Sequence, residues 1–145
     1  ALLPNQPAAV PVSSSGGPAT QPIYESVLIV DDDPLVCDLL VQFLRLRGYR
    51  VVGVNDGIDA LNFVDDTPPD VILLDLIMPG MSGVEALRML REKEYQGGII
   101  LMTGSHNEEL LEEAWALSPQ EVLVKPIDLD RLLTTIQLVL VCREC

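Results

Sequence analysis

Four short apolar runs of this sequence end in residues that are suited to phosphoryl chemistry. Three aspartates at 31–33 follow one run, Asp75 follows another, and Thr103 and Lys125 end two more. Carboxylates about 5 Å apart repel by about 3 kcal/mol at an effective dielectric near 20, so a cluster of them requires a cation or protons. Mg²⁺ binds through one or two carboxylates plus phosphate, and a lysine neutralises phosphoryl oxygens. The set therefore indicates phosphoryl transfer with a divalent cation.

Each of these residues alone has a simpler interpretation. Asp33 before Pro34 is typical of a helix cap, and an aspartate after a strand is common in turns. Thr103 before Gly104 fits a plain passage from strand to loop. The conjunction favours chemistry, because four runs independently end in the residue types that phosphoryl transfer requires.

Five apolar runs rich in β-branched residues predict five strands. They begin 20 to 30 residues apart and alternate with helical patterns, at residues 27–30, 51–54, 71–74, 99–102 and 122–124. Near-continuous apolar strands separated by helices indicate a parallel sheet covered on both faces. We expect an α/β fold of the doubly wound type. With a strand order of 2-1-3-4-5, the groups that follow the first and third strands meet at one edge of the sheet.

Capping signals and apolar spacing predict the helices between these strands. The first helix begins at Pro34, ends at Gly48 and carries apolar residues at helical spacing, namely Leu35, Leu39, Phe43 and Leu46. Asn55 and Asp56 open the second, which ends before Pro68 and carries Ile58, Leu61 and Val64. A capping box of Ser82 and Glu85 starts the third, which runs to about Lys93. The fourth covers about 107–117, and the fifth begins after Asp128.

Four motifs of the sequence resemble the receiver domain of two-component response regulators. They are VLIVDDDP at 27–34, VILLDLIMPGMSG at 71–83, IILMT at 99–103 and VLVKP at 122–126. The resemblance extends over about residues 25–141 and implies a flavodoxin-like (βα)5 fold. It also implies a function: such a domain takes a phosphoryl group from a phospho-histidine donor and thereby switches its interactions with partners. It catalyses only its own phosphorylation and dephosphorylation, so it is not otherwise an enzyme.

The resemblance assigns roles to individual residues. Asp75 becomes the phospho-acceptor, and Asp31, Asp32, Asp75 and the backbone carbonyl of Ile77 become the Mg²⁺ ligands. Thr103 would sense the phosphoryl group and Lys125 would contact its oxygens. The resemblance further predicts a cis Lys125–Pro126 bond, with the lysine in salt-bridge reach of Asp75. In the family an aromatic residue usually stands three positions before this lysine; here the residue is Val122, so the resemblance does not extend to an aromatic switch at this position.

Two alternatives stay open at this point. Asp31 and Asp33 also resemble the nucleophile and the acid/base of haloacid-dehalogenase-type phosphatases, but that hypothesis leaves Asp75 unexplained and has only Asp128 and Asp130 for a further acidic pair. A degenerate receiver that serves only as an interaction module is the other. Since His106 is the only histidine and lies in a loop, the phosphoryl donor is expected on a sensor histidine kinase or a phosphotransfer protein.

Composition restricts the class of protein further. The 145 residues carry a net charge of −13, which disfavours binding to nucleic acid or anionic lipid. No apolar run reaches the length of a membrane span, and no signal peptide is evident. Three cysteines give no disulfide framework, and the pair Cys142 and Cys145 lacks the other ligands of a zinc site. A cytoplasmic protein is therefore expected.

The two ends of the chain carry separate predictions. Residues 1–24 contain five prolines and no charged side chain, so we expect a linker or tail there and the receiver domain at 25–145. The missing initiator methionine suggests processing or an excised fragment. In the last helix one apolar face is expected against the sheet, while Leu138 and Val141 remain exposed. Because the face around the fourth and fifth helices is a common contact surface in the receiver family, a homodimer through this helix is one hypothesis.

Overall fold

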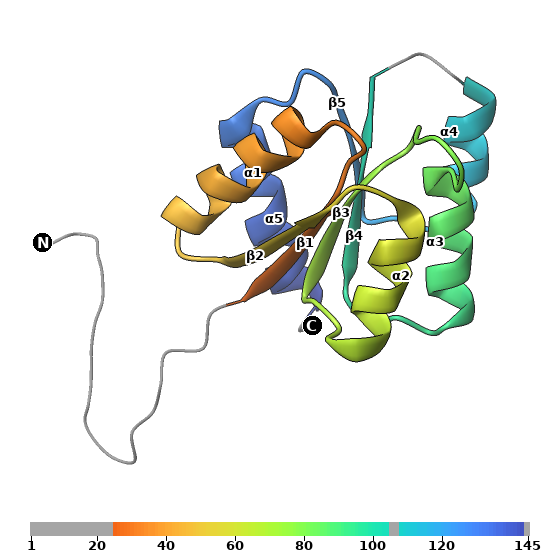
Figure 1. Ribbon diagram of the computed structural model, residues 1–145, viewed down its shortest axis with the longest axis horizontal. Helices are drawn as coiled ribbons and strands as arrows, with labels where there is room; N and C mark the ends of the chain where they lie inside the picture. The colour runs from red at the N-terminus through yellow and green to blue at the C-terminus, as the bar shows by residue number, and fades with distance from the viewer. Residues whose placement is uncertain (1–24, 105–107, 144–145) are drawn as a thin grey trace, which may run out of the picture.

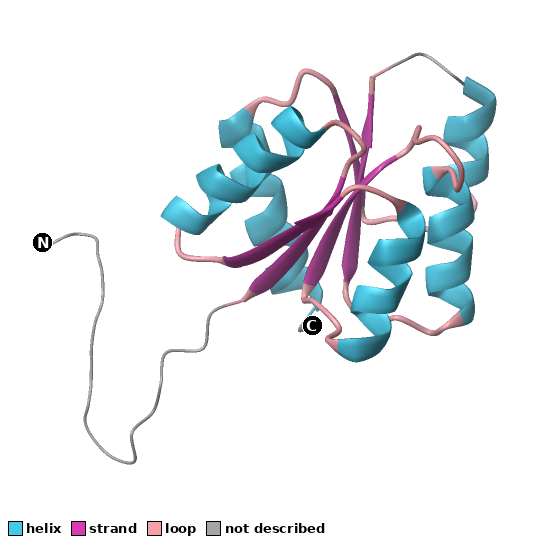
Figure 2. Ribbon diagram, viewed as in Figure 1, coloured by secondary structure: helices cyan, strands magenta, loops and turns pink. Residues whose placement is uncertain are grey.

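The computed structural model describes residues 25–104 and 108–143 and contains one five-stranded parallel sheet (Figures 1 and 2). Its strand order, β2-β1-β3-β4-β5, confirms the predicted order. Each strand contains the apolar run that predicted it, and the bounds are β1 (Ser26–Val30), β2 (Arg50–Val54), β3 (Val71–Asp75), β4 (Gly98–Thr103) and β5 (Glu121–Val124). The tail at 1–24, His106 and Cys145 lie outside the described residues.

Five helices alternate with the strands, as predicted. They are α1 (Pro34–Leu46), α2 (Gly57–Asp66), α3 (Gly83–Glu92), α4 (Glu108–Trp115) and α5 (Leu129–Arg143). Asp33 caps α1, since its carboxylate accepts the backbone N–H of Leu35 at 3.0 Å. The predicted capping box is present at the start of α3, where Ser82 and Glu85 exchange side-chain to backbone hydrogen bonds of 3.1 and 3.2 Å. The sequence signals therefore locate the helix starts correctly.

The helices form two layers, one on each face of the sheet. Figure 1 shows α1 and α5 on one face and α2, α3 and α4 on the other. Alternate residues of each strand supply the two apolar cores: Leu28 belongs to one and Ile29 to the other. The central strands β3 and β4 are buried along their whole length. The carboxyl ends of the strands therefore sit on a rigid, doubly covered sheet.

Helix α1 has two apolar faces, and the structure buries the one that the sequence analysis did not single out. The leucines whose spacing predicted the helix are exposed, Leu35 by 81%, Leu39 by 58% and Leu46 by 85%. The buried residues are instead Cys37, Leu40, Val41 and Leu44. Both sets recur at helical spacing, so periodicity predicts the helix but not which side faces the sheet.

The last helix follows its prediction. The inner face of α5 buries Leu132, Ile136, Val139 and Leu140 against the sheet, while Leu138 and Val141 are exposed.

None of the helices that the structure describes is long and apolar enough to cross a membrane.

Candidate functional site

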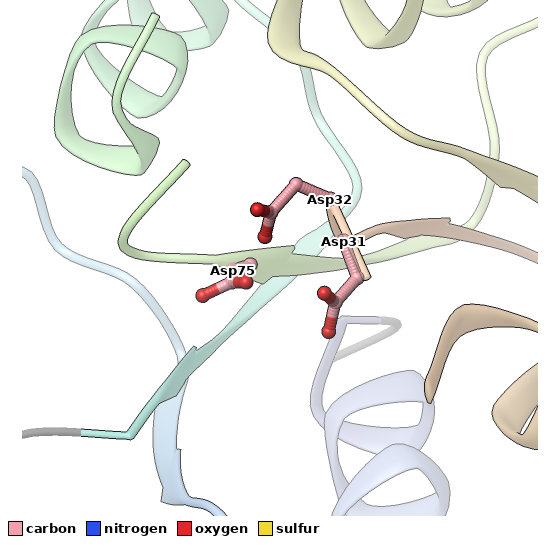
Figure 3. A group of neighbouring side chains, drawn as sticks. All are labelled: Asp31, Asp32 and Asp75. Carbon is pink, nitrogen blue, oxygen red and sulfur yellow. The ribbon is translucent and has the colours of Figure 1, made fainter. Parts of the chain in front are cut away.

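Three aspartates meet where β1 and β3 end at the carboxyl edge of the sheet (Figure 3). Asp31 and Asp32 follow β1, and Asp75 is the last residue of β3. Because the two strands are hydrogen-bonded neighbours, one carboxylate oxygen from each of the three residues lies within 4.8 Å of the others. Asp31 is 0% and Asp75 4% exposed, whereas Asp32 is open to solvent. The sheet therefore brings together the three side chains that the sequence assigns to a metal site.

Lys125 lies between the two buried carboxylates. Its ammonium nitrogen is 2.8 Å from Asp31 Oδ2 and 3.1 Å from Asp75 Oδ2. The contact with Asp75 confirms the prediction, and so does the cis peptide bond between Lys125 and Pro126. The closer contact, with Asp31, was not predicted. The strand order is the one sequence signal for it: because the ends of β1 and β3 lie side by side, a lysine that reaches Asp75 also comes close to Asp31.

Short hydrogen bonds from the backbone hold the acidic side chains in position. Asp31 Oδ1 accepts the N–H of Asp33 at 2.9 Å, and Asp75 Oδ1 accepts the N–H of Ile77 at 3.2 Å. Asn55 donates its side-chain amide to the backbone carbonyl of Asp31 at 2.9 Å. In the sequence Asn55 indicates only the start of α2, whereas in the structure it also supports the acidic loop. Fixed carboxylates lose less conformational entropy when they bind a ligand.

Burial and charge act in opposite directions on the ionisable groups. Desolvation raises the pKa of Asp75 from 3.8 to about 6, against the lowering effect of Lys125 and of the Ile77 N–H, while the neighbouring Asp31 adds to the rise. Burial lowers the pKa of Lys125, but its bonds to Asp31 and its attraction to Asp75 outweigh this and raise the pKa above its usual value. The lysine therefore stays charged, and Asp75 is the carboxyl whose charge is costly.

The start of α3 fixes the backbone directly after Asp75. The N–H of Gly83 donates to the carbonyl of Leu76 at 2.8 Å. A Cβ at Gly83 would collide with the carbonyl oxygen of Asp75 and lie only 2.6 Å from the Leu76 Cα. Glycine is therefore required here by close approach of the two backbones.

The remaining predicted residues lie around this cluster. Thr103 is buried at the end of β4, and its carbonyl accepts the N–H of Lys125 at 2.7 Å. Val122 is half-buried and packs against the core on the α2, α3 and α4 side, where the family usually has an aromatic ring. Ile77 is the second residue after the end of β3, and its side chain is exposed. All predicted site residues thus belong to one end of the sheet.

The donor set suits a hard divalent cation. Among the described residues, the cluster combines three carboxylates with one ammonium, an excess of acid that a divalent cation would neutralise. Oxygen ligands on an open rim, with Asp32 exposed, match the preference of Mg²⁺ for a few carboxylates plus water and phosphate. Asp33 is not part of the cluster, because its carboxylate caps α1.

A family model and solved structures match this chain over most of its length. The model of the response regulator receiver domain matches residues 27–137. A receiver domain protein from Methanospirillum hungatei superposes with a TM-score of 0.81 at 25% identity, over 84% of this chain and 98% of that one. Chemotaxis protein CheY4 of Vibrio cholerae gives a TM-score of 0.76 at 32% identity, over 81% and 99% of the two chains.

Curated relatives include both short and long proteins. Sporulation initiation phosphotransferase F of Bacillus subtilis is 32% identical over 108 residues, which are 74% of this chain and 87% of that protein. Regulatory protein AtoC of Escherichia coli is 37% identical over 111 residues, 77% of this chain but 24% of the relative. This chain thus corresponds to about a quarter of the length of one relative and most of the other.

Proposed function

The chain belongs to the family of response regulator receiver domains, and from this premise we propose that Asp75 accepts a phosphoryl group from a phospho-histidine donor. The position of Asp75 carries the proposal, since it is buried between Lys125 and the acid pair at the carboxyl edge of the sheet. Receiver domains of this family act in two-component signalling, which agrees with a chain whose chemistry is limited to its own phosphorylation and dephosphorylation.

In the proposed reaction a carboxylate oxygen of Asp75 attacks phosphorus. The bond between phosphorus and the donor imidazole nitrogen breaks, that nitrogen keeps the electron pair, and an acyl phosphate forms on Asp75. Lys125 already touches Asp75 and would neutralise a phosphoryl oxygen. Thr103, buried at the end of β4, would contact another. These groups stand in place before the reaction, so little reorganisation is needed.

Asp31, Asp32, Asp75 and the carbonyl of Ile77 are the residues that would hold Mg²⁺. The bound ion would supply positive charge to the transferring phosphoryl oxygens. Asp31 also holds Lys125 at 2.8 Å and thereby orients the lysine toward the acceptor. Asp32, the exposed member of the acid set, is the ligand through which the ion would exchange with solvent.

The phosphoryl donor is proposed to be a sensor histidine kinase or a phosphotransfer protein, because an aspartate acceptor requires a histidine donor and the described residues of this chain contain none. A cytoplasmic location is part of the same proposal. Nothing in the comparisons supports the phosphatase alternative, and its acid/base, Asp33, is a helix cap. Direct nucleic-acid binding by this domain is not proposed, given its net charge of −13. A homodimer through α5, which rests on the exposed Leu138 and Val141, remains one hypothesis for self-association, and Leu138→Glu would test it.

Intact mass after incubation with a small phosphodonor tests the acceptor. We expect one phosphoryl group per chain in the presence of Mg²⁺, none after chelation, and none for Asp75→Asn. Asp65→Asn is the control, because the Asp65 side chain is exposed on α2, does not belong to the acid cluster and pairs with Lys93 among the described residues. A label found on Asp31 would favour the phosphatase mechanism, and an unchanged mass of the wild type would overturn the proposal.

A further inference from the structure

The outward side of α1 is an apolar seam with coiled-coil spacing. Its four residues lie alternately four and three positions apart, which is the pattern of the a and d positions of a heptad. Three of the four are leucines with more than half of their surface exposed. The four residues, called the outer seam below, are Leu35, Leu39, Gln42 and Leu46.

This seam lies directly opposite the buried side of the helix. The residues that pack on the sheet are Cys37, Leu40, Val41 and Leu44, about half a helical turn around from the seam. Figure 1 shows α1 together with α5 in the helix layer on one face of the sheet. From Leu35 to Leu46 the seam is about 16 Å long, at 1.5 Å per residue. Single exposed leucines are ordinary, but three in register on one short helix form a contact surface.

Charged residues on one flank of the seam make it complementary to itself. Asp38 and Arg45 lie one heptad apart, each directly before a leucine of the seam, which is the g position. If two α1 helices lie antiparallel, Asp38 of each faces Arg45 of the other. Arg45 is already held on this flank, since its guanidinium donates two hydrogen bonds to the carbonyl of Val51, at 2.8 and 3.2 Å.

The charge of the surrounding segment also favours contact between two copies. Residues 32–50 contain three aspartates and three arginines and are neutral, whereas the whole chain carries −13. Two copies therefore meet here with less repulsion than elsewhere on the acidic surface. Asp38 lies in the first half of α1 and Arg45 in the second, so an antiparallel arrangement brings these two unlike charges together on the flank of the seam.

We propose that the outer seam of α1 binds the outer seam of a second copy of this chain in an antiparallel, two-fold symmetric pair. In this pair Leu35 faces Leu46 of the other copy, and Leu39 faces Gln42. A contact between two helices of 13 residues is smaller than a standard interface, so the dimer is weak and reversible. It is also isologous, which limits assembly to two chains.

Sedimentation of the full chain at physiological salt, from about 10 μM to 1 mM, tests the pair. We expect a monomer at the low end and a rising share of dimer at the high end. Leu39→Glu should weaken association at least tenfold, because it places a charge in the centre of the seam. Ile58→Glu, an equally exposed position on α2, and Leu138→Glu on α5 are matched controls that should leave association unchanged.

A charge exchange tests the orientation. Asp38→Arg and Arg45→Glu should each weaken self-association about fivefold, because like charges then face each other. An equal mixture of the two variants should recover the wild-type level, since each pair of unlike charges forms again between different chains. Circular dichroism and thermal unfolding of each variant verify that the fold is intact, which matters for Arg45 because of its bonds to Val51.

Three outcomes would overturn the proposal. The first is a wild type that remains monomeric at 1 mM, which would leave the seam to a different protein. The second is association that Leu138→Glu abolishes and Leu39→Glu does not, which would assign the dimer to α5. The third is a mixture of the two charge variants that associates no better than either variant alone, which would exclude the antiparallel pair.

Discussion

The carboxyl edge of the sheet and the outer seam of α1 reverse the usual distribution of side chains in opposite ways. At the edge, two carboxylates and most of a lysine are buried, with Asp31 fully enclosed. On the seam, Leu35 and Leu46 expose more than four-fifths of their surface. Helix α1 connects the two regions, because Asp33, which caps it, directly follows the acid pair.

Each region is unfavourable in the isolated domain. Buried charge is costly unless it is paired, and exposed apolar surface is costly unless it is covered. The edge reduces its cost internally through Lys125, whereas none of the described residues covers the seam. The edge is therefore organised before its ligand arrives, while the seam depends on a contact from outside.

The largest effect is expected from removing the internal ion pairing at the edge. Lys125→Met should lower the free energy of unfolding by about 3 kcal/mol, since it leaves the buried Asp31 and Asp75 carboxylates without their counter-charge. Urea denaturation measures it. Lys93→Met is the control: its partner Asp65 is exposed, so the loss should stay below about 1 kcal/mol. Equal losses would break the distinction between a paired, buried edge and ordinary surface.

The next effect concerns the charge of Asp75. Its folded-state pKa of about 6 exceeds the ordinary 3.8, so ionisation destabilises the fold at neutral pH, and the penalty disappears as the pH falls through 6 toward 4. Asp75→Asn should therefore be more stable than the wild type by about 2 kcal/mol at pH 7.5 and by about half of that at pH 5. Denaturation without divalent cations at both pH values measures this. A pH-independent difference would contradict the burial argument.

Addition of Mg²⁺ should have a smaller, stabilising effect. At ten times its dissociation constant a ligand that binds only the folded state raises the unfolding free energy by about 1.4 kcal/mol. The gain should shrink at pH 5, where protonation of Asp75 competes with the ion. Asp32→Asn should lose most of the gain, whereas Asp33→Asn should keep it, because Asp33 caps α1 and asparagine caps equally well. Equal gains in both variants would contradict the proposed ligand set.

The smallest effect is expected on the seam in dilute solution. Leu39→Ala should change the unfolding free energy by less than about 0.5 kcal/mol at 5 μM protein, because more than half of the Leu39 surface is exposed in the structure. Ile58→Ala is the matched control. Near 1 mM, Leu39→Ala alone should fall below the wild type, since the wild type then gains stability from association. If the unfolding free energies of Leu39→Ala and Ile58→Ala changed alike at all concentrations, the seam would not differ from ordinary surface.

Sequence patterns predicted that the site residues meet at one edge of the sheet, because that meeting depends on where each strand ends. Each strand ends where its apolar run stops, so Asp75 and Thr103 fall at strand ends in the structure as in the sequence. The bond between Lys125 and Asp31 was missed, because the residues are 94 positions apart and the exact approach of two strand ends is a property of packing.

The orientation of α1 was beyond the reach of periodicity. Leu39 and Leu40 are neighbours with the same side chain, yet one is exposed and the other is buried. The inner face packs closely on β2: a Cβ at Gly53 would lie only 2.6 Å from Cys37 Sγ, so the glycine of the strand makes room for the cysteine of the helix. Such a choice depends on two elements meeting and leaves no mark in either segment alone.

The close approach at Gly83 has a consequence for how this domain can diverge. Because any side chain at this position would strike the carbonyl of Asp75, the start of α3 and the acceptor cannot drift apart through small, independent substitutions. The exposed residues of α3 can change without disturbing this contact, whereas its first turn fixes the backbone next to the acceptor. Retention of the phosphoryl chemistry in related sequences therefore requires glycine at position 83 as well as the acidic residues.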